Sequence, residues 1–453
     1  MRLFSSLHKF ATLRTIALTI LFLSSILLFP SLSLAQEKEK KEEQQPRDSE
    51  EIYADLALFG QVFDRIRAEY VDVPDERELI RAAIDGMLSS LDPHSGYLSP
   101  RSYDDMIQDT SGEFGGLGIE VTMEEGVVKI VAPIDDTPAS RAGLLSNDYI
   151  TELDGQQVLG MTLDEAVGIM KGLIGTKITL TVVREGVDEP LSFELTRDTI
   201  SLRAVRHVIE QDIGIIRLSR FSEQAYSGIE KAIRDIYDER DGKAPKGLIL
   251  DLRNNPGGLV DQAVFVADAF LDKGAVVLTR GRLEDESVRY EAKTDDLDRL
   301  IKDVPLVVLI NGGSASSSEI LAGALQDQKR ATLVGTRSFG KGTVQSIISL
   351  GSNGAMRLTT SRYYTPSNRS IQALGITPDI EIFQDVPEEL KGRDEIVGEA
   401  ALPGHINGEE EQETTAGSSV YVPGDTSLDN QRNYAIKLIL GEESNDAFPP
   451  KKK

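Results

Sequence analysis

Two segments in the second half of the chain share one pattern, in which a buried strand, a glycine-rich turn, a helix and another strand follow each other. Residues 247–252 (GLILDL) lead into RNNPGG, and residues 305–310 (PLVVLI) lead into NGGSASS. A short apolar run bounded by turn residues is typical of a strand that helices cover on both faces. Residues 198–385 are therefore predicted to form an α/β core with two strand-turn-helix crossovers. Catalytic groups gather at the carboxyl ends of strands in such folds, where both glycine-rich turns lie.

Two further modules precede this core. In residues 52–111, apolar residues recur at helical spacing on both sides of the turn VDVPDE, which predicts an N-terminal helical module. In residues 112–197, short strands alternate with one or two helices, which predicts a small, partly open β-barrel. The 453 residues are therefore expected to form a multidomain α/β protein.

The block at residues 112–197 resembles a PDZ domain. The stretch GGLG stands at the carboxylate-binding loop, and PASRAGL and NDYITELDG follow downstream. Glycines let successive backbone N–H groups converge on an anion, and the strand from Ile119 to Met123 offers an edge to which an extended peptide can add. The residues expected to hold a chain terminus are Gly115, Gly116, Leu117, Gly118 and Ile119.

The chain is acidic, with 74 acidic against 49 basic residues and a net charge of −25. Such a chain repels a phosphate backbone, so nucleic acid is not expected as a partner. Much of the acidity lies in QEKEKKEEQQPRDSE and HINGEEEQETTAG. These stretches predict a charged linker at residues 36–51 and an acidic, largely disordered tail at 386–453, with a short helix near 430–440. No cysteine occurs, which excludes disulfides, a cysteine nucleophile and thiolate metal sites.

Residues 1–35 have the pattern of a secretory signal peptide. Basic residues precede an apolar run at 15–29, and the segment ends in small residues at Ala35. An uncleaved anchor is the alternative, although a spanning helix needs about 20 apolar residues and this run is shorter. The protein is therefore expected to be exported to the periplasm, and association with the inner membrane stays open.

Ser316 lies where the strand at 305–310 gives way to a helix, beside N–H groups that favour negative charge. Its spacing to Glu319 is also that of a capping box, so a helix cap is the competing interpretation. A nucleophilic serine needs a base, and Lys341 in RSFGKGTVQ is the candidate, because burial can keep a lysine partly neutral. Gln345 is the candidate for accepting from the ammonium or orienting the amine. An exposed turn lysine and a solvent-facing glutamine are the competing interpretations of the last two.

The segments LDLRNNPGG, NGGSASSSEILAGALQDQKRATLVG and RSFGKGTVQ resemble the signatures of the carboxyl-terminal processing peptidases, also called tail-specific proteases. The resemblance covers about residues 52–385, with helical module, PDZ domain and core in the family's order. It implies that Ser316 is the nucleophile, that Lys341, 25 residues later, is the base and that Gln345 supports the base. No metal and no cofactor are implied.

The oxyanion hole is expected to consist of the backbone N–H of Ser317 and that of Gly257 or Gly258. Glycine allows a close approach of the substrate, and one such donor contributes about 3 kcal/mol to transition-state binding. A plain loop after a strand is the alternative for the two glycines. Ser317 departs from the resemblance, which implies a small residue such as alanine, but its N–H is unaffected.

Rival interpretations of the same residues are weaker. GTRSFGKG matches a phosphate-binding loop except at Gly342, where Ser or Thr is required, and a strand-like segment follows instead of a helix. Ser338 and Lys341 form an S-x-x-K pair, but the flanking glycines argue against the helical turn that it needs. A triad based on His94, His207 or His405 lacks the G-x-S-x-G elbow, and these histidines are expected to be structural.

The function expected from the sequence is that of a serine endopeptidase of the cell envelope. It binds protein carboxyl termini through its PDZ domain and cleaves near them through an acyl-enzyme. Its expected partners are proteins or peptides with free C-termini, and a homodimer and an envelope adaptor stay open. The alternative is a catalytically silent PDZ scaffold protein of the envelope.

Overall fold

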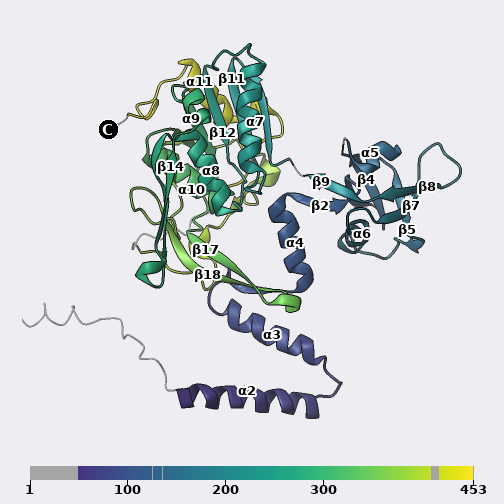
Figure 1. The fold of residues 1–453 in the computed structure, drawn as a ribbon. Coiled ribbons are helices and arrows are strands. Elements are labelled where there is room, and N and C mark those ends of the chain that lie inside the picture. Colours follow the sequence, from purple (N-terminus) through teal and green to yellow (C-terminus); the bar gives the residue numbers. More distant parts are fainter. Residues whose placement is uncertain (1–48, 125, 135, 202, 410–417, 452–453) are drawn as a thin grey trace, which may run out of the picture. The chain divides into compact units, whose positions relative to one another are not determined.

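The computed structural model describes residues 49–451 except 125, 135, 202 and 410–417 (Figure 1). The predicted signal peptide at 1–35, and the predicted linker up to residue 48, lie outside the described residues. The chain divides into two units, Met1–Ile80 and Arg81–Lys453. Within the described residues, no helix combines the length and the apolar character that crossing a bilayer requires.

The first unit contains helix α2 (Ser49–Glu69) and the start of α3 (Glu76–Ser89). Acidic Glu50 and Glu51 stand in the first turn of α2 and Arg67 in its last, which is the arrangement that the helix dipole favours. No residue of α2 is buried, and several of its large apolar side chains are exposed. The α2 residues that share this exposure are Ile52, Tyr53, Leu56, Leu58, Phe59 and Val62.

A short segment of the second unit leads from α3 to the PDZ block. It contains β1 (Gly96–Leu98) and α4 (Pro100–Ser111). Ser99 caps α4 by accepting from the N–H of Ser102, and Gly112 ends the helix in the left-handed conformation. Helices α2, α3 and α4 agree with the helical periodicity of residues 52–111, and β1 is a short strand between α3 and α4.

The PDZ block contains a sheet in the order β3-β4-β5-β7-β8, with β6 added to β5, and a separate antiparallel pair, β2 and β9. Alternate residues of β7 are buried, as expected for a strand with one covered face. They pack with Ala166 and Met170 of α6 into a separate apolar core. The bounds are β2 Glu113–Gly116, β3 Ile119–Glu124, β4 Val127–Pro133, α5 Pro138–Ala142, β5 Tyr149–Leu153, β6 Gln156–Gln157, α6 Leu163–Met170, β7 Lys177–Val183, β8 Leu191–Thr196 and β9 Asp198–Ser201.

The remaining core is built on a six-stranded sheet in the order β10-β11-β12-β15-β16-β19. Strand β10 is antiparallel to β11, and all other neighbours are parallel. The bounds are β10 Val205–Glu210, β11 Ile213–Leu218, β12 Gly247–Asp251, β15 Leu306–Ile310, β16 Thr332–Gly335 and β19 Ile380–Glu381.

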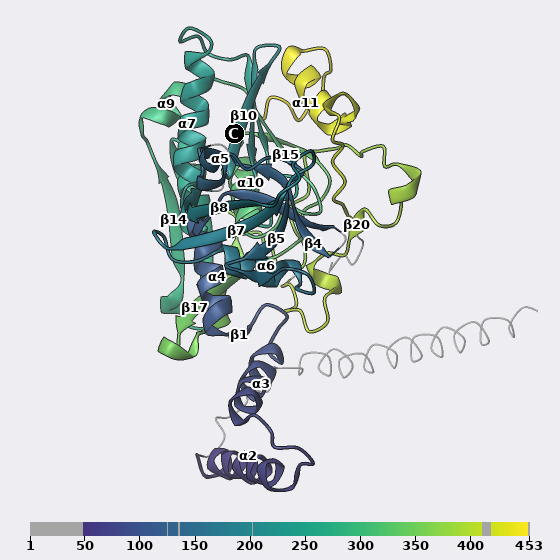
Figure 2. The same cartoon turned by 90° about the vertical axis from the view of Figure 1, so that its right-hand side faces the viewer.

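Helices cover both faces of this sheet, so its central strands are apolar on both sides. Leu306, Val308 and Ile310 pack with α7 (Ala225–Asp238), α8 (Val260–Phe270) and α10 (Ser317–Asp327). The intervening Val307 and Leu309 pack with α11 (Asn430–Leu440) on the other face. Figure 2 shows α7 and α11 on opposite sides of the strands.

A second sheet, in the order β1-β18-β13-β14 with β17 paired to β18, contributes to the core. Helices α8 and α10 contact both this sheet and each other. The bounds are β13 Lys273–Gly281, β14 Val288–Lys293, β17 Thr343–Ser349 and β18 Ala355–Tyr364, and the short α9 spans Asp296–Ile301.

Only one of the two expected crossovers stays within one sheet. The unit β15-α10-β16 returns to the parallel neighbour of β15, as predicted. The unit β12-α8-β13 instead leads into the second sheet, and β12 pairs with β15. The prediction of two crossovers is therefore wrong for β12-α8-β13, whereas the multidomain α/β class is confirmed. Apolar periodicity does not distinguish a strand that returns to its sheet from one that starts another.

The segment after residue 385 differs from the largely disordered tail that its composition predicts. Residues 386–409 and 418–451 are described, and they include β20 (Glu395–Ile396), paired with β21 (Ser418–Ser419), and α11. Ala435, Ile436 and Leu438 of α11 are buried against the six-stranded sheet. Apolar burial of this kind stabilises a short helix that its own propensity would not hold.

Candidate active site

Ser316 occupies the turn between β15 and α10. It is the N-cap residue of α10 and has φ 54° and ψ −113°. A positive φ is rare for a residue other than glycine, and such strain is concentrated at functional sites. A serine on a sharp, strained turn between strand and helix is also the geometry that presents a nucleophilic hydroxyl.

Glu319, one turn into α10, binds both the Ser316 turn and the Lys341 turn. Its carboxylate accepts from the N–H of Ser316 at 2.7 Å and from the N–H of Lys341 at 2.9 Å. It also accepts from the Ser338 hydroxyl at 2.6 Å and from the N–H of Gly340 at 2.7 Å. Burial raises the pKa of Glu319 to about 7, against these four hydrogen bonds, which favour its charged form. The Glu319 side chain thus belongs to the site and not merely to a helix cap.

Lys341 follows β16 in an irregular turn that leads into β17. Burial lowers the pKa of Lys341 below its ordinary value. The charge of Glu399 opposes this effect and that of Arg357 reinforces it. Burial thus favours the neutral amine, which is the form that a general base needs.

Ser316, Lys341 and Gln345 line one pocket of about 340 Å³. Asp109 and Thr110 of α4 contribute to its wall, as do Arg220 and the glycine-rich segment that follows β12. Of the three described histidines, none lines it. The remaining lining residues are Phe221, Pro256, Gly257, Gly258, Leu259, Val260, Ile347 and Tyr363. The pocket thus combines apolar side chains with a few polar groups, as ligand-binding pockets commonly do.

The glycine turn after β12 lies against the start of α10. A Cβ added to Gly257 would lie 2.8 Å from the Ala315 carbonyl oxygen and 2.9 Å from Cβ of Ser316, so only glycine allows this approach. The N–H of Gly257 donates to Asn255 Oδ1 at 2.9 Å. Of the two glycines named from the sequence, Gly258 is therefore the one favoured as an oxyanion donor.

Ser317, the other expected oxyanion donor, is fully buried as the first residue of α10. Its hydroxyl donates to the carbonyl oxygen of Gly258 at 2.9 Å. This bond joins the two segments that would supply the two oxyanion N–H groups. The serine that departs from the expected small residue therefore has a structural contact of its own.

Gln345 lies on β17, and its side-chain amide is held from two strands. Its Nε2 donates to the hydroxyls of Thr343 at 2.9 Å and Thr359 at 3.3 Å. With both amide hydrogens so directed, the carbonyl oxygen is the atom left to interact with the lysine ammonium. Gln345 is partly buried, unlike a solvent-facing strand residue.

The predicted carboxylate loop of the PDZ block divides into two parts. Gly115 and Gly116 belong to β2 and pair with Thr199 and Asp198 of β9. Leu117 is buried, and Gly118 has φ 74°. A Cβ on Gly118 would lie 2.2 Å from Cβ of Thr137. A rotation of the Thr137 side chain cannot relieve this overlap, because Cβ is fixed to the backbone.

The strand after this loop stands at the edge of the PDZ sheet. Ile119 begins β3, which pairs with β4 on one side and ends the strand order on the other. A strand in this position is the kind to which an extended peptide adds.

Sequence reasoning missed Glu399 and Gln372, and it did not recognise that His94 contacts Glu399. Glu399 is fully buried and accepts from His94 Nε2 at 2.8 Å and from Gln372 Nε2 at 3.0 Å. The interpretation of His94 as a structural loop residue agrees with this contact. A glutamate next to small apolar residues in GEAALPG was the one available signal, since buried carboxylates need partners.

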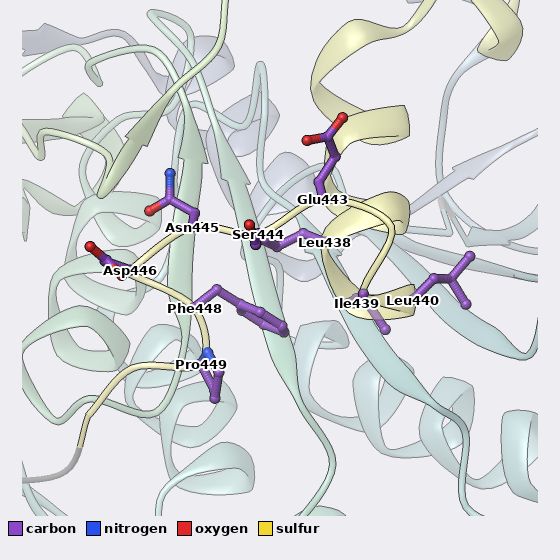
Figure 3. Close-up of a pocket in the computed structure, with 10 residues that line it drawn as sticks. Leu438, Ile439, Leu440, Glu443, Ser444, Asn445, Asp446, Phe448 and Pro449 are labelled. Carbon is purple, nitrogen blue, oxygen red and sulfur yellow. The ribbon is translucent and has the colours of Figure 1, made fainter.

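A larger pocket, of about 730 Å³, lies elsewhere in the second unit. Figure 3 shows that its lining comes from the end of α11 and the segment after it, up to Pro449. None of the predicted site residues lines it. Within the described residues, no group of histidine and carboxylate side chains is arranged to hold a metal ion.

Comparison with known proteins gives matches along most of the chain. The models for peptidase family S41, for a PDZ domain and for the N-terminal domain of the activating protease CtpB match residues 212–382, 115–195 and 21–101. A carboxy-terminal-processing protease of Bartonella bacilliformis is 52% identical over 429 residues, which are 95% of this chain and 96% of that protein. A carboxyl-terminal-processing protease of Synechocystis sp. is 38% identical, over 78% and 83%. A solved photosystem II D1 C-terminal processing protease is 28% identical over 72% and 92%, with a TM-score of 0.41.

Proposed function

Because this chain belongs to the carboxyl-terminal processing proteases of peptidase family S41 and is a serine-type protease, we propose that Ser316 and Lys341 form its catalytic dyad. One observation carries the proposal. The strained Ser316 at the start of α10 shares a pocket with a lysine whose pKa burial lowers. The pairing supplies both a nucleophile and a base whose neutral form is favoured by burial.

The proposed reaction proceeds through an acyl-enzyme. Neutral Lys341 takes the hydroxyl proton of Ser316 while the oxygen attacks the substrate carbonyl carbon. The N–H groups of Ser317 and Gly258 stabilise the resulting oxyanion. The protonated amine of Lys341 then donates to the leaving nitrogen as the peptide bond breaks, and water, activated by the same amine, hydrolyses the ester. Gln345 orients the amine between these steps.

We further propose that the PDZ domain selects substrates by their free carboxyl termini. Leu117, Gly118 and Ile119 would surround the carboxylate, and β3 would pair with the last residues of the substrate. The names of the relatives describe carboxy-terminal processing, which such recognition would serve. Cleavage would then occur close to the bound end.

The location that we propose is the cell envelope, on the strength of the signal-peptide pattern in residues 1–35. A homodimer is proposed as well, because α2 exposes a set of large apolar side chains. An envelope adaptor is a further candidate partner, without a contact surface that identifies it.

The dyad is tested by comparing purified wild-type protein with the S316A and K341A variants on an unstructured protein substrate. We expect both variants to lose more than about a thousandfold in kcat/KM, because a dyad acts as a unit. The matched control is Lys243→Ala, at an exposed turn position before β12. Equal cleavage by all forms would exclude the dyad, and an inactive wild type would favour the silent scaffold.

Recognition of the terminus has its own test. A peptide with a free C-terminal carboxylate and the same peptide with an amidated C-terminus are compared as substrates. The amidated peptide is expected to be cleaved at least about tenfold more slowly at low concentration, since a lost charged hydrogen bond costs roughly 1.5–3 kcal/mol. Identical rates would contradict recognition through the carboxylate.

A further inference from the structure

Glu399 brings a buried carboxylate to the turn that carries Lys341. Its side chain is 1% exposed, and it stands at the start of a 3₁₀ turn in the segment that follows the core. Its backbone N–H donates to the carbonyl oxygen of Phe339 at 3.0 Å, two residues before the lysine. A buried carboxylate is costly unless it is paired and hydrogen-bonded, so its partners indicate what it stabilises.

The partners of Glu399 connect it to the residue after the lysine. Gln372 Nε2 donates to Glu399 at 3.0 Å, and Gln372 Oε1 accepts from the N–H of Gly342 at 2.9 Å. On the other side of the turn, Glu319 accepts from the N–H of Gly340. The backbone on each side of Lys341 is thus held by a side chain from outside the turn.

His94 holds the carboxylate from the other direction. Its Nε2 lies 2.9 and 2.8 Å from the two oxygens of Glu399. The carbonyl oxygen of His94 accepts from Arg357 Nε at 2.7 Å, and its N–H donates to Asp92 at 2.9 Å. The loop after α3 therefore places His94 against Glu399, and the charge of its Asp92 also acts on Lys341.

The charged groups that act on Lys341 are Glu399, Arg357, Glu319 and Asp92. Burial lowers the pKa of Lys341 most, and among the charges Glu399 has the largest effect, which raises it. Removing the charge of Glu399 while keeping its shape should therefore favour the neutral amine.

We propose that Glu399 is a positioning residue for the catalytic base, which holds the Lys341 turn through Gln372 and is itself oriented by His94. The inference rests on the proposed Ser316/Lys341 dyad. It gives the loop after α3 and the segment after the core an indirect role in catalysis, since neither supplies a reacting atom.

The test is the pH dependence of kcat/KM for the wild type, E399Q and E399A. Activity that needs neutral Lys341 rises with pH, and in E399Q this rise should move to lower pH by about one unit, with kcat at the plateau within about threefold. E399A loses the anchor as well, and its kcat should fall about 10–100-fold with KM within about twofold. The matched control E395Q removes an exposed carboxylate four residues earlier and should match the wild type.

The His94 contact is tested with a pair of variants. H94A should lower kcat about tenfold, and H94Q, which keeps a donor, should recover most of it. The proposal is overturned if E399Q leaves the pH profile unmoved, or if all Glu399 and His94 variants lose activity only in proportion to the folded fraction seen in thermal melts. An inactive wild type, or an S316A variant as active as the wild type, would instead refute the dyad itself.

Discussion

Ser316 and Lys341 donate their backbone N–H groups to the same atom, Oε2 of Glu319, at 2.7 and 2.9 Å. The two residues lie 25 positions apart on turns that follow neighbouring parallel strands, β15 and β16. Parallel strands place their carboxyl ends at one edge of a sheet, which brings the turns together only approximately. A buried carboxylate that binds both turns defines their separation to within a hydrogen-bond length.

Replacing Glu319 by glutamine should therefore disturb the dyad without changing the volume of the side chain. Each carboxylate oxygen accepts from two of the four donors, so two donors would face an amide NH₂ group in place of an oxygen. A buried donor without an acceptor costs about 1–3 kcal/mol. We expect kcat to fall about 10–100-fold, because misplacement by a fraction of an ångström lowers the rate. Steady-state kinetics with Glu389→Gln, an exposed carboxylate, as the control would check this. Unchanged kcat would show that the shared acceptor does not set the geometry.

The raised pKa of Glu319 also predicts that the stability difference between the wild type and E319Q depends on pH. The pKa of Glu319 is about 7 in the folded protein and about 4.3 in an unfolded chain, so the folded state binds this proton more tightly. The stability that this proton contributes is present below the unfolded value and is lost as pH rises through 7. Denaturant unfolding of the wild type and E319Q from pH 4.5 to 7.5 should show the wild type losing stability relative to the variant. A difference independent of pH would contradict it.

Gly257→Ala tests the contact between the glycine turn and the nucleophile. Gly257 has φ 100°, and a Cβ there would overlap the Ala315 carbonyl oxygen and Cβ of Ser316. The turn must shift, which moves the adjacent Gly258 N–H, and we expect kcat to fall by about 100–1,000-fold, as when an oxyanion donor is lost. Gly242→Ala is the control, because it has φ 76° but no atom within 4 Å of its Cβ. If both variants lose activity equally, backbone strain rather than crowding is responsible.

The sequence predicts the strands and the two glycine-rich turns from short-range patterns, and the resemblance to the carboxyl-terminal processing peptidases implies that Ser316 and Lys341 act together. The structure confirms the fold class, and the comparisons confirm the family. The placement of β13 in a second sheet was not predictable, since a helix followed by an apolar strand has the same pattern in either sheet. The roles of individual site residues stay predictions.

The contributions of distant segments were also beyond the sequence. Glu319 matches a capping box locally, and nothing in that spacing shows that the carboxylate also binds the turn at Lys341. Glu399 and His94 contact each other across 305 positions, a pairing that no periodicity encodes. Asp429, the N-cap residue of α11, is hydrogen-bonded to Arg253, again far away in the chain. Long-range polar pairs of this kind are set by the tertiary fold and have no local signature.

Gly118→Ala tests the PDZ loop. With φ 74° and a Cβ 2.2 Å from that of Thr137, an alanine forces the loop away from its present path. We expect affinity for a peptide with a free carboxylate to fall at least about tenfold, because converging N–H groups lose their alignment. Fluorescence anisotropy with a labelled peptide on the Ser316→Ala protein, which does not consume it, measures this. Gly186→Ala, in the turn between β7 and β8 with φ 80° and open space, is the control. Equal affinities of the two variants for the peptide would show that its carboxylate does not bind at the Gly118 loop.

Asp429→Ala tests what holds α11 and the segment after the core in place. Arg253, which follows β12, donates from Nη1 and Nη2 to the two oxygens of Asp429 at 2.8 Å each, and their side chains are 2% and 3% exposed. Removing the carboxylate leaves the guanidinium with Asp251 as its remaining carboxylate partner, and breaking such a buried pair costs about 3 kcal/mol. Urea unfolding should show this loss, whereas Glu291→Ala, whose pair with Arg289 is more than half exposed, should lose at most about 0.5 kcal/mol. Burial alone would raise the pKa of Asp429, but its bonds to Arg253 hold this pKa below the usual range. The stability that the wild type has in excess of Asp429→Ala should therefore be lost as pH falls through the pKa of Asp429 in the folded protein. If Asp429→Ala is no less stable than Glu291→Ala, the apolar face of α11 alone holds the segment.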